Sequence, residues 1–381
     1  MNASQTHPTL DLSIWEDLTP DPSILIVDGP SPRMYVTGGT RDTRTRKTSG
    51  QSLCIIDGPK RDNPRTRYVH ATDQVVKHIV ILSGHGSPSL DAIRFLADQG
   101  ITWAIIDAGG KSPRILGTSG QTIDAKLMRL QAMAAPGFPL EWAGVQIIRE
   151  LTTLKLEGQA FNAEYVLSNP QLAKAIRSQI DGALTVTRDT AKDTLASIMG
   201  YEGTGADAYW TAWKGIAPLW HRITTVLKPN WLSYPGRKSL RRSETNRKAT
   251  DPINAALNFG YHAAESWCII ALLAAGLDPR MGIQHVDTDG RASFALDLIE
   301  TVRPIVDEIV LDIFMTGRLN GPGSERLDPR MLWSDREGIV HVSQPLTGVI
   351  AQRVGLRCQT HLSPVVRRIA DLLTSTTMSG S

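Results

Sequence analysis

The chain has 381 residues, of which 41% are hydrophobic and 21% are charged, and its formal net charge is +3 at pH 7. This composition is typical of a globular protein, excludes a low-complexity chain and, with the length, favours two domains over one. Three isolated cysteines argue against a disulfide framework and against a cysteine-rich zinc site. No apolar stretch reaches the roughly 18–20 residues that a membrane-spanning helix needs. Acidic residues also stand where a secretory leader would be apolar, so we expect a cytoplasmic protein without membrane contact.

Short apolar runs rich in β-branched residues predict strands in the first 120 residues. The runs lie at 24–28, 34–37, 53–57, 75–82 and 101–107. One helix is expected among them at 88–99, where Leu90, Ile93 and Leu96 recur at helical spacing before Gly100. We therefore expect a small N-terminal β-rich domain with one helix over residues 1–120.

From Asp124 onward the apolar residues recur every three or four positions, which is the period of amphipathic helices. Further helical patterns lie at 170–180, 190–199, 206–217, 252–275, 291–303 and 305–316. Pro304 separates the last two, because proline disrupts a helix interior. Residues 325–342 suggest a helix and a short strand, and 364–373 a terminal helix. The expected fold class is thus α+β, with a larger all-α domain over residues 124–376.

Two familiar ligand-binding patterns are incomplete. Gly110-Lys111-Ser112 ends like a phosphate-binding loop, but Ile105 stands where the first glycine of that loop belongs. The stretch from His285 resembles a calcium loop, yet its twelfth position is Leu296 instead of the glutamate that such a loop requires. The sequence therefore supports neither a P-loop nucleotide site nor a calcium loop.

Four residues form a candidate metal centre: Glu202, His285, Asp297 and Glu300. Asp297 and Glu300 are three apart in a helical pattern, so they share a face. That helix is largely apolar, and two buried carboxylates are costly without a cationic partner. One imidazole with carboxylates suits Mg²⁺ or Mn²⁺ better than a structural zinc.

A purely structural interpretation of the same residues stays open. Glu202 is flanked by glycines and is expected just before a helix, where it would cap the N-terminus. Asp297 and Glu300 would then pair with Arg291 and Arg303 on a surface.

The segments around these residues resemble one family, the CRISPR-associated adaptation integrase, a metal-dependent nuclease that inserts new spacers into CRISPR arrays. The resemblance is carried, in the family's order, by 199–210 (Met-Gly-Tyr-Glu-Gly to Tyr-Trp), 251–261, 276–285 and 293–304. It implies that Glu202, His285 and Glu300 are the metal ligands, with Asp297 as a supporting catalytic carboxylate. It also implies a homodimer joined through the β-rich domain and a small ferredoxin-like companion protein.

The reaction that the resemblance implies is direct transesterification. The 3′-hydroxyl of a DNA fragment attacks a phosphodiester of the array, and hydrolysis is the same reaction with water. Two alternatives remain: a transposon-encoded relative that integrates element ends, which a C-terminal helix-turn-helix would favour, and a catalytically silent DNA-binding scaffold.

A basic cluster precedes the helix expected at 252–275, and within it six basic residues face one acid. Its members are Arg237, Lys238, Arg241, Arg242, Arg247 and Lys248. Cations of this kind hold the DNA backbone without reading its sequence. The alternative is a solvated loop.

Overall fold

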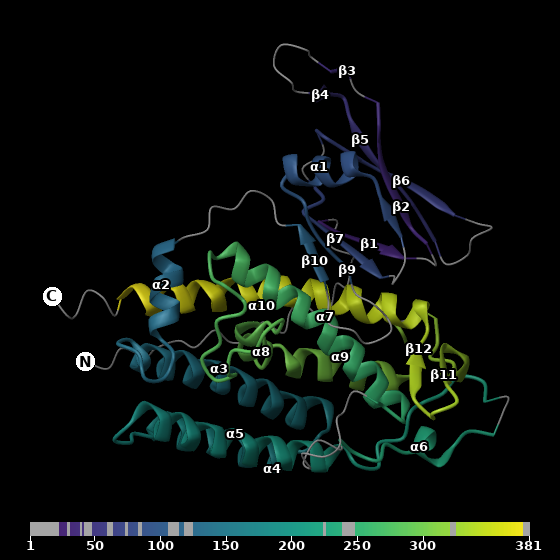
Figure 1. The fold of residues 1–381 in the computed structure, drawn as a ribbon. Coiled ribbons are helices and arrows are strands. Elements are labelled where there is room, and N and C mark those ends of the chain that lie inside the picture. The colour runs from purple at the N-terminus through teal and green to yellow at the C-terminus, as the bar shows by residue number, and fades with distance from the viewer. Residues whose placement is uncertain are drawn as a thin grey trace.

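A computed structural model of the chain describes residues 23–28, 31–38, 40–41, 48–58, 64–72, 75–82, 86–105, 114–117, 125–223, 226–237, 248–320 and 325–375. Within these ranges a strand-rich N-terminal part is followed by a mostly helical part (Figure 1). The α+β class expected from the sequence is confirmed. The strands of the N-terminal part end at Gly117 and the helices of the second part begin at Ala125, while the division into separate domains at 120 and 124 stays a prediction.

Two four-stranded sheets make up the N-terminal part. The first sheet has the order β1 (Ile24–Asp28), β7 (His78–Leu82), β9 (Thr102–Ile105) and β10 (Arg114–Gly117), of which the first three are parallel. The second has the order β6 (Arg65–His70), β5 (Ser52–Asp57), β2 (Arg33–Thr37) and β8 (Ser87–Pro88). The short strands β3 (Thr40–Arg41) and β4 (Thr48–Ser49) pair with each other. Helix α1 (Leu90–Asp98) begins at Ser89, whose hydroxyl accepts the N–H of Ala92.

The first sheet joins the two parts of the molecule, because successive side chains of a strand point to opposite faces. Ile79 and Ile81 of β7 pack in the core of the strand-rich part. Val80 and Leu82 belong instead to the continuous core of the helical part. The sheet is therefore covered on both faces.

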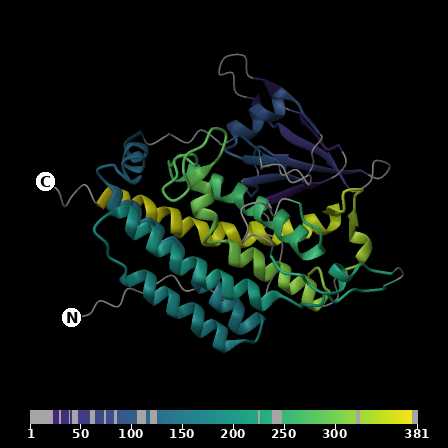
Figure 2. The same cartoon turned by 60° about the horizontal axis from the view of Figure 1, so that its bottom comes forward.

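The helical part is built from nine α-helices among the described residues. They are α2 (Ala125–Met133), α3 (Glu141–Phe161), α4 (Pro170–Thr185), α5 (Ala191–Trp213), α6 (Pro229–Leu232), α7 (Pro252–Ala274), α8 (Ser293–Ile299), α9 (Arg303–Thr316) and α10 (Gln344–Ser375). A π-helical turn (Asn162–Val166) extends α3, and a 3₁₀ turn (Pro329–Met331) precedes the hairpin of β11 (Leu332–Ser334) and β12 (Val340–Val342). Figure 2 shows α3, α4 and α5 packed side by side, with α7, α9 and α10 between them and the sheets.

Three expectations about the helical part were wrong in detail. Helix α5 runs without a break where two helices were expected, so Glu202 lies inside a helix and does not cap one. Helix α10 begins twenty residues before the expected terminal helix and contains Pro364, which lies on its exposed side. Over 325–342, where a helix and one short strand were expected, the structure has a 3₁₀ turn and the two strands of the hairpin β11–β12.

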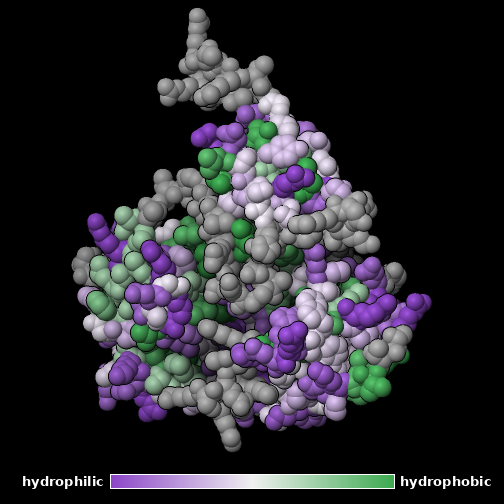
Figure 3. Space-filling model, turned by 45° about the vertical axis from the view of Figure 1, so that its right-hand side comes forward, coloured by the Kyte–Doolittle hydropathy of each residue, from purple (hydrophilic) through white to green (hydrophobic). Residues whose placement is uncertain are grey.

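Within the described residues, no helix combines the length and the apolar run that crossing a membrane requires. The face of the molecule seen in Figure 3 carries hydrophilic and hydrophobic areas side by side.

Candidate metal centre

Three packed elements bring the candidate residues together. Glu202 lies on α5, Glu300 directly follows α8, and α3 passes between them with Lys155. Glycine allows this close packing: a Cβ at Gly205 of α5 would lie 2.7 Å from Cδ2 of Leu156 on α3. The carboxylates of Glu202 and Glu300 both approach Lys155 of α3.

Lys155 joins the two carboxylates. Its Nζ forms an ion pair with Oε1 of Glu202 and lies 2.5 Å from Oε2 of Glu300. The side chains of Lys155, Glu202 and Glu300 are 10%, 20% and 15% exposed, so the cluster is largely shielded from water. Two of the three acids that the sequence singles out, Glu202 and Glu300, thus converge on one cation.

Asp297 holds His285 and the turn around it. Its carboxylate accepts the backbone N–H groups of Ile283, Gln284 and His285, at 2.7 to 3.1 Å. Its Oδ1 also lies 2.6 Å from Nδ1 of the His285 ring. The Asp297 side chain is fully buried. With Nδ1 engaged in this way, Nε2 is the ring nitrogen left to bind a metal.

Glu300 is ionised in this environment. Burial by itself would raise the pKa of Glu300, but the charges of Arg303, Lys155 and His285 lower it to about 2. Nε of Arg303 lies 3.0 Å from Oε1 of Glu300, on the opposite side of the carboxylate from Lys155. The pairing of Glu300 with Arg303 considered from the sequence is present; the Glu300 side chain is 15% exposed and the Arg303 side chain is 36% exposed.

Lys155 is charged as well. Burial lowers the pKa of its ammonium, and the neighbouring carboxylates of Glu300 and Glu202 more than offset this, so its pKa lies above the ordinary value. Lys155 was not among the site residues expected from the sequence, although a lysine among the apolar residues of α3 was a visible signal.

The donor groups are chemically of the kinds that bind a divalent metal. Two carboxylate oxygens converge on a cationic group, and a held imidazole with one free nitrogen lies near Glu300. Such oxygen-rich donors match Mg²⁺ or Mn²⁺. In the described part of the chain no three His, Cys, Asp or Glu side chains are close enough to hold a metal together. The ammonium of Lys155 stands between the two glutamates.

One described member of the basic cluster lies beside this site. The guanidinium of Arg237 sits over the rings of Trp210 and Tyr261, 5.4 and 5.0 Å from their centroids, and donates to Asn254 and Asn258. That Arg237 contacts the DNA backbone stays a prediction.

The other members of the basic cluster give less information. Lys248 forms an exposed ion pair with Glu337, at 3.1 Å. Lys238, Arg241, Arg242 and Arg247 lie outside the described residues.

Tyr261, whose ring Arg237 covers, contacts a buried acid, Asp307. The Tyr261 hydroxyl donates to Asp307 of α9. Burial raises the pKa of Asp307 to about 7, although the hydrogen bond from Tyr261 and the charges of Arg237 and Arg303 oppose this change. The interior next to the site therefore contains a carboxyl group that titrates near neutrality.

Comparisons with known proteins agree with the fold. The chain matches the family model described as CRISPR associated protein Cas1 over residues 43–334. It is 29% identical to CRISPR-associated endonuclease Cas1 2 of Pyrobaculum aerophilum, over 74% of this chain and 82% of the relative. Among solved structures, a casposase bound to an integration product has a TM-score of 0.68 at 20% identity, with 93% and 91% of the two chains covered. A Cas1 protein from Thermotoga maritima has a TM-score of 0.62 at 14% identity, with 92% and 97% covered.

Proposed function

The chain belongs to the Cas1 family of CRISPR-associated proteins, and from that premise we propose that Glu202, His285 and Glu300 form its divalent-metal centre. It is an endonuclease and integrase of CRISPR adaptation. The observation that carries the proposed centre is the convergence of Glu202 and Glu300 on one cationic group beside a fixed imidazole.

The identity of the metal is part of the proposal. The family depends on divalent metals, and two carboxylates with one imidazole favour Mg²⁺ or Mn²⁺ over softer ions. When bound, such an ion would polarise the scissile phosphodiester and lower the pKa of the attacking hydroxyl.

The residues around the centre have separate roles in this proposal. Glu202 and Glu300 supply carboxylate oxygens, and His285 supplies Nε2. Asp297 positions His285 by holding Nδ1 and the surrounding backbone. Arg303 keeps Glu300 ionised. Catalysis then consists of placing the reacting groups and stabilising developing charge.

The bond changes are those of transesterification. The 3′-hydroxyl oxygen of a DNA fragment forms a bond to phosphorus of the array, and the array's own 3′ oxygen leaves and takes up a proton. Hydrolysis uses water as the attacking group. No covalent intermediate with the protein is needed.

The partners belong to the proposal too. We propose that the DNA fragment and the CRISPR array bind along the helical part, where Arg237 and the rest of the basic cluster would hold the backbone. Two copies would associate through the strand-rich part, with a small ferredoxin-like companion between them. Mass measurement of the purified protein, alone and with that companion, tests this assembly.

The alternative of a transposon-encoded relative has less support. A C-terminal helix-turn-helix would favour it, but residues 344–375 form one continuous helix. The intact acid and imidazole positions also disfavour a silent scaffold.

Cleavage of branched DNA with Mn²⁺ tests the metal centre. Glu202→Gln and His285→Asn should each lower the rate by roughly a hundredfold or more, because each removes a group that holds the metal. Glu150→Gln is a matched control, since Glu150 forms an exposed ion pair with Arg368. Unchanged cleavage by the first two variants would contradict the proposed centre.

A further inference from the structure

The contact between Lys155 and the two glutamates carries an inference that deepens the proposed function and rests on it. Lys155 reaches from α3 between Glu202 of α5 and Glu300 beyond α8. Oε2 of Glu300 is the atom nearest Lys155, and the two form an ion pair. The other oxygen of that carboxylate is paired with Arg303. The lysine thus neutralises the side of Glu300 that faces Glu202.

An ammonium and a divalent cation cannot both occupy the space between two carboxylates. Both are positive, and the shielded site weakens the screening of their repulsion. Without either cation, two ionised acids would face each other in a poorly hydrated interior, which is costly. One cation is needed there, and a second is excluded.

We propose that Lys155 is a built-in counter-cation that holds the metal position in the metal-free protein and is displaced when the metal binds. This role has two opposite effects. Lys155 stabilises the folded protein before the metal arrives, and it weakens metal binding by competing for Glu202 and Glu300. A lysine that only supported the geometry of the acids would instead strengthen metal binding.

Calorimetric titration of Mn²⁺ into DNA-free protein separates these roles by the sign of the effect. Lys155→Met keeps most of the side-chain length and removes the charge, so it should bind Mn²⁺ at least about tenfold more tightly than the unchanged protein. In EDTA the same variant should unfold at a lower temperature, and saturating Mn²⁺ should restore it. Equal or weaker Mn²⁺ binding by Lys155→Met would overturn the proposal.

Three further proteins make the experiment decisive. Lys155→Arg keeps the charge and should retain weak binding, which also covers the case that Lys155→Met does not fold. Lys174→Met, at an exposed lysine of α4, should change nothing. Glu202→Gln combined with Lys155→Met should not bind Mn²⁺. If that double variant binds as tightly as Lys155→Met, the proposed metal centre is wrong. This outcome is distinct from the one that overturns the proposed role of Lys155.

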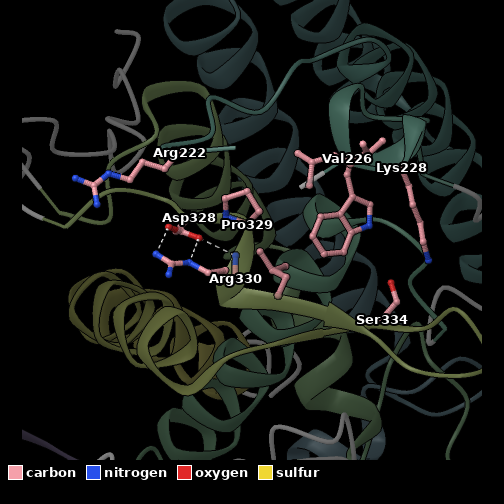
Figure 4. A pocket seen from close by; sticks show the side chains of 10 residues that line it. Arg222, Val226, Lys228, Asp328, Pro329, Arg330 and Ser334 are labelled. Carbon is pink, nitrogen blue, oxygen red and sulfur yellow. Dashed lines mark hydrogen bonds and ion pairs between the residues drawn. The ribbon is translucent and has the colours of Figure 1, made fainter. Parts of the chain in front are cut away.

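A second, independent observation is a pocket on the helical part, of about 410 Å³. Its apolar side is formed by Trp231, Pro329 and Leu332. Arg222 and Arg330 lie together at one end, and Lys228 extends at the other (Figure 4). The pocket therefore has an apolar middle and cations at both ends.

The acid that lines the pocket is already neutralised. Asp328 accepts two hydrogen bonds from the Arg330 side chain, at 2.9 and 2.7 Å, and this pairing lowers the pKa of Asp328. Arg222 has a left-handed backbone, with φ of 59°, which is unfavourable for a residue other than glycine. The cations of Arg222 and Lys228 are exposed.

We infer that this pocket holds one unpaired nucleotide of a DNA strand, an inference that rests on DNA being the substrate. The base would lie against the apolar side, and the phosphates before and after it would meet the two cationic ends. Bases stack on aromatic and apolar groups without regard to sequence, and cationic side chains bind the adjacent phosphates. Cations at both ends suit a continuous strand better than a free nucleotide with phosphate on one side.

Branched DNA with one 2-aminopurine in its unpaired arm tests the pocket. Fluorescence should change on binding, and Arg222→Ala with Lys228→Ala should abolish that change and lower the salt dependence of binding by about two phosphate contacts. Lys174→Ala is the control, because Lys174 is exposed and lies outside both the pocket and the basic cluster. Glu202→Gln should keep the fluorescence change while losing cleavage. An unaltered signal and salt slope in the double variant would reject the pocket and leave the metal centre intact.

Discussion

Nδ1 of His285 lies 2.6 Å from Oδ1 of Asp297, and the same carboxylate accepts three backbone N–H groups of the turn that carries the histidine. One buried acid therefore fixes both the ring and its backbone. A metal-binding histidine commonly donates its second nitrogen to a carboxylate in this way, which orients the ring and makes it a better ligand.

Asp297→Asn should weaken Mn²⁺ binding by about 10- to 100-fold, the usual effect of losing such a partner of a metal-bound histidine. The reason is that an amide accepts these hydrogen bonds less strongly and no longer stabilises the ring. Calorimetry measures the change. Asp287→Asn is a matched control in the same turn, because Asp287 accepts only the N–H of Gly282 and is exposed. Equal losses in both variants would indicate damage to the turn and no particular role for Asp297.

Asp307 should make the protein less stable as the pH rises. Its pKa is about 7 in the folded protein and near 3.8 ordinarily, so the folded state keeps a proton that the unfolded state has lost. The contribution of Asp307 to stability is complete below about pH 4 and is lost as the pH approaches 7. Asp307→Asn should therefore gain stability relative to the unchanged protein between pH 4.5 and pH 8, measured by urea unfolding. A constant difference across that range would contradict the raised pKa.

His361 should make the protein less stable as the pH falls. Burial and the charge of Arg357 lower its pKa to about 4, from an ordinary value of 6.5. The unfolded chain then binds the proton first, so stability is lost as the pH falls from 6.5 towards 4. His361→Gln should remove this loss, and its unfolding midpoint relative to the unchanged protein should rise between pH 7 and pH 4.5. A midpoint difference that does not change with pH would argue that His361 is accessible to water in the folded state.

Gly158 should be intolerant of a side chain. A Cβ at this position of α3 would lie 2.6 Å from Cβ of Pro304, at the start of α9. Gly158→Ala should cost about 1–3 kcal/mol by overpacking and should reduce cleavage, because it separates Lys155 from Glu300. Gly200→Ala is the control, since its Cβ would meet nothing within 4 Å and alanine favours a helix. Thermal unfolding and cleavage assays compare the two variants, and equal stability in both would show that α3 can move away without cost.

The sequence predicted those features that depend on local patterns. The apolar runs located β1, β5 and β7, and the helical pattern around Asp297 located α8, which Glu300 directly follows. The continuity of α5 was not predictable from the sequence, because its glycines disfavour a helix locally. The glycine at position 205 is explained only by the packing of α5 against α3.

Sequence patterns could not predict the contacts of Lys155, for a different reason. Its partners are 47 and 145 positions away, so no window of sequence contains both charges. A lysine in an amphipathic helix normally extends its ammonium into water. The arrangement of three helices, which no periodicity specifies, decides that Lys155 points inward.

Helix α10 also has a consequence for how the protein is made. Its buried residues cover α7, and it lies against strand β1, near the beginning of the chain. A ribosome has therefore synthesised the elements that carry Glu202, His285 and Glu300 before it produces the helix that completes their core. A nascent chain that stops before Gln344 leaves one wall of this core open. DNA-cutting competence should thus arise only in chains translated through α10.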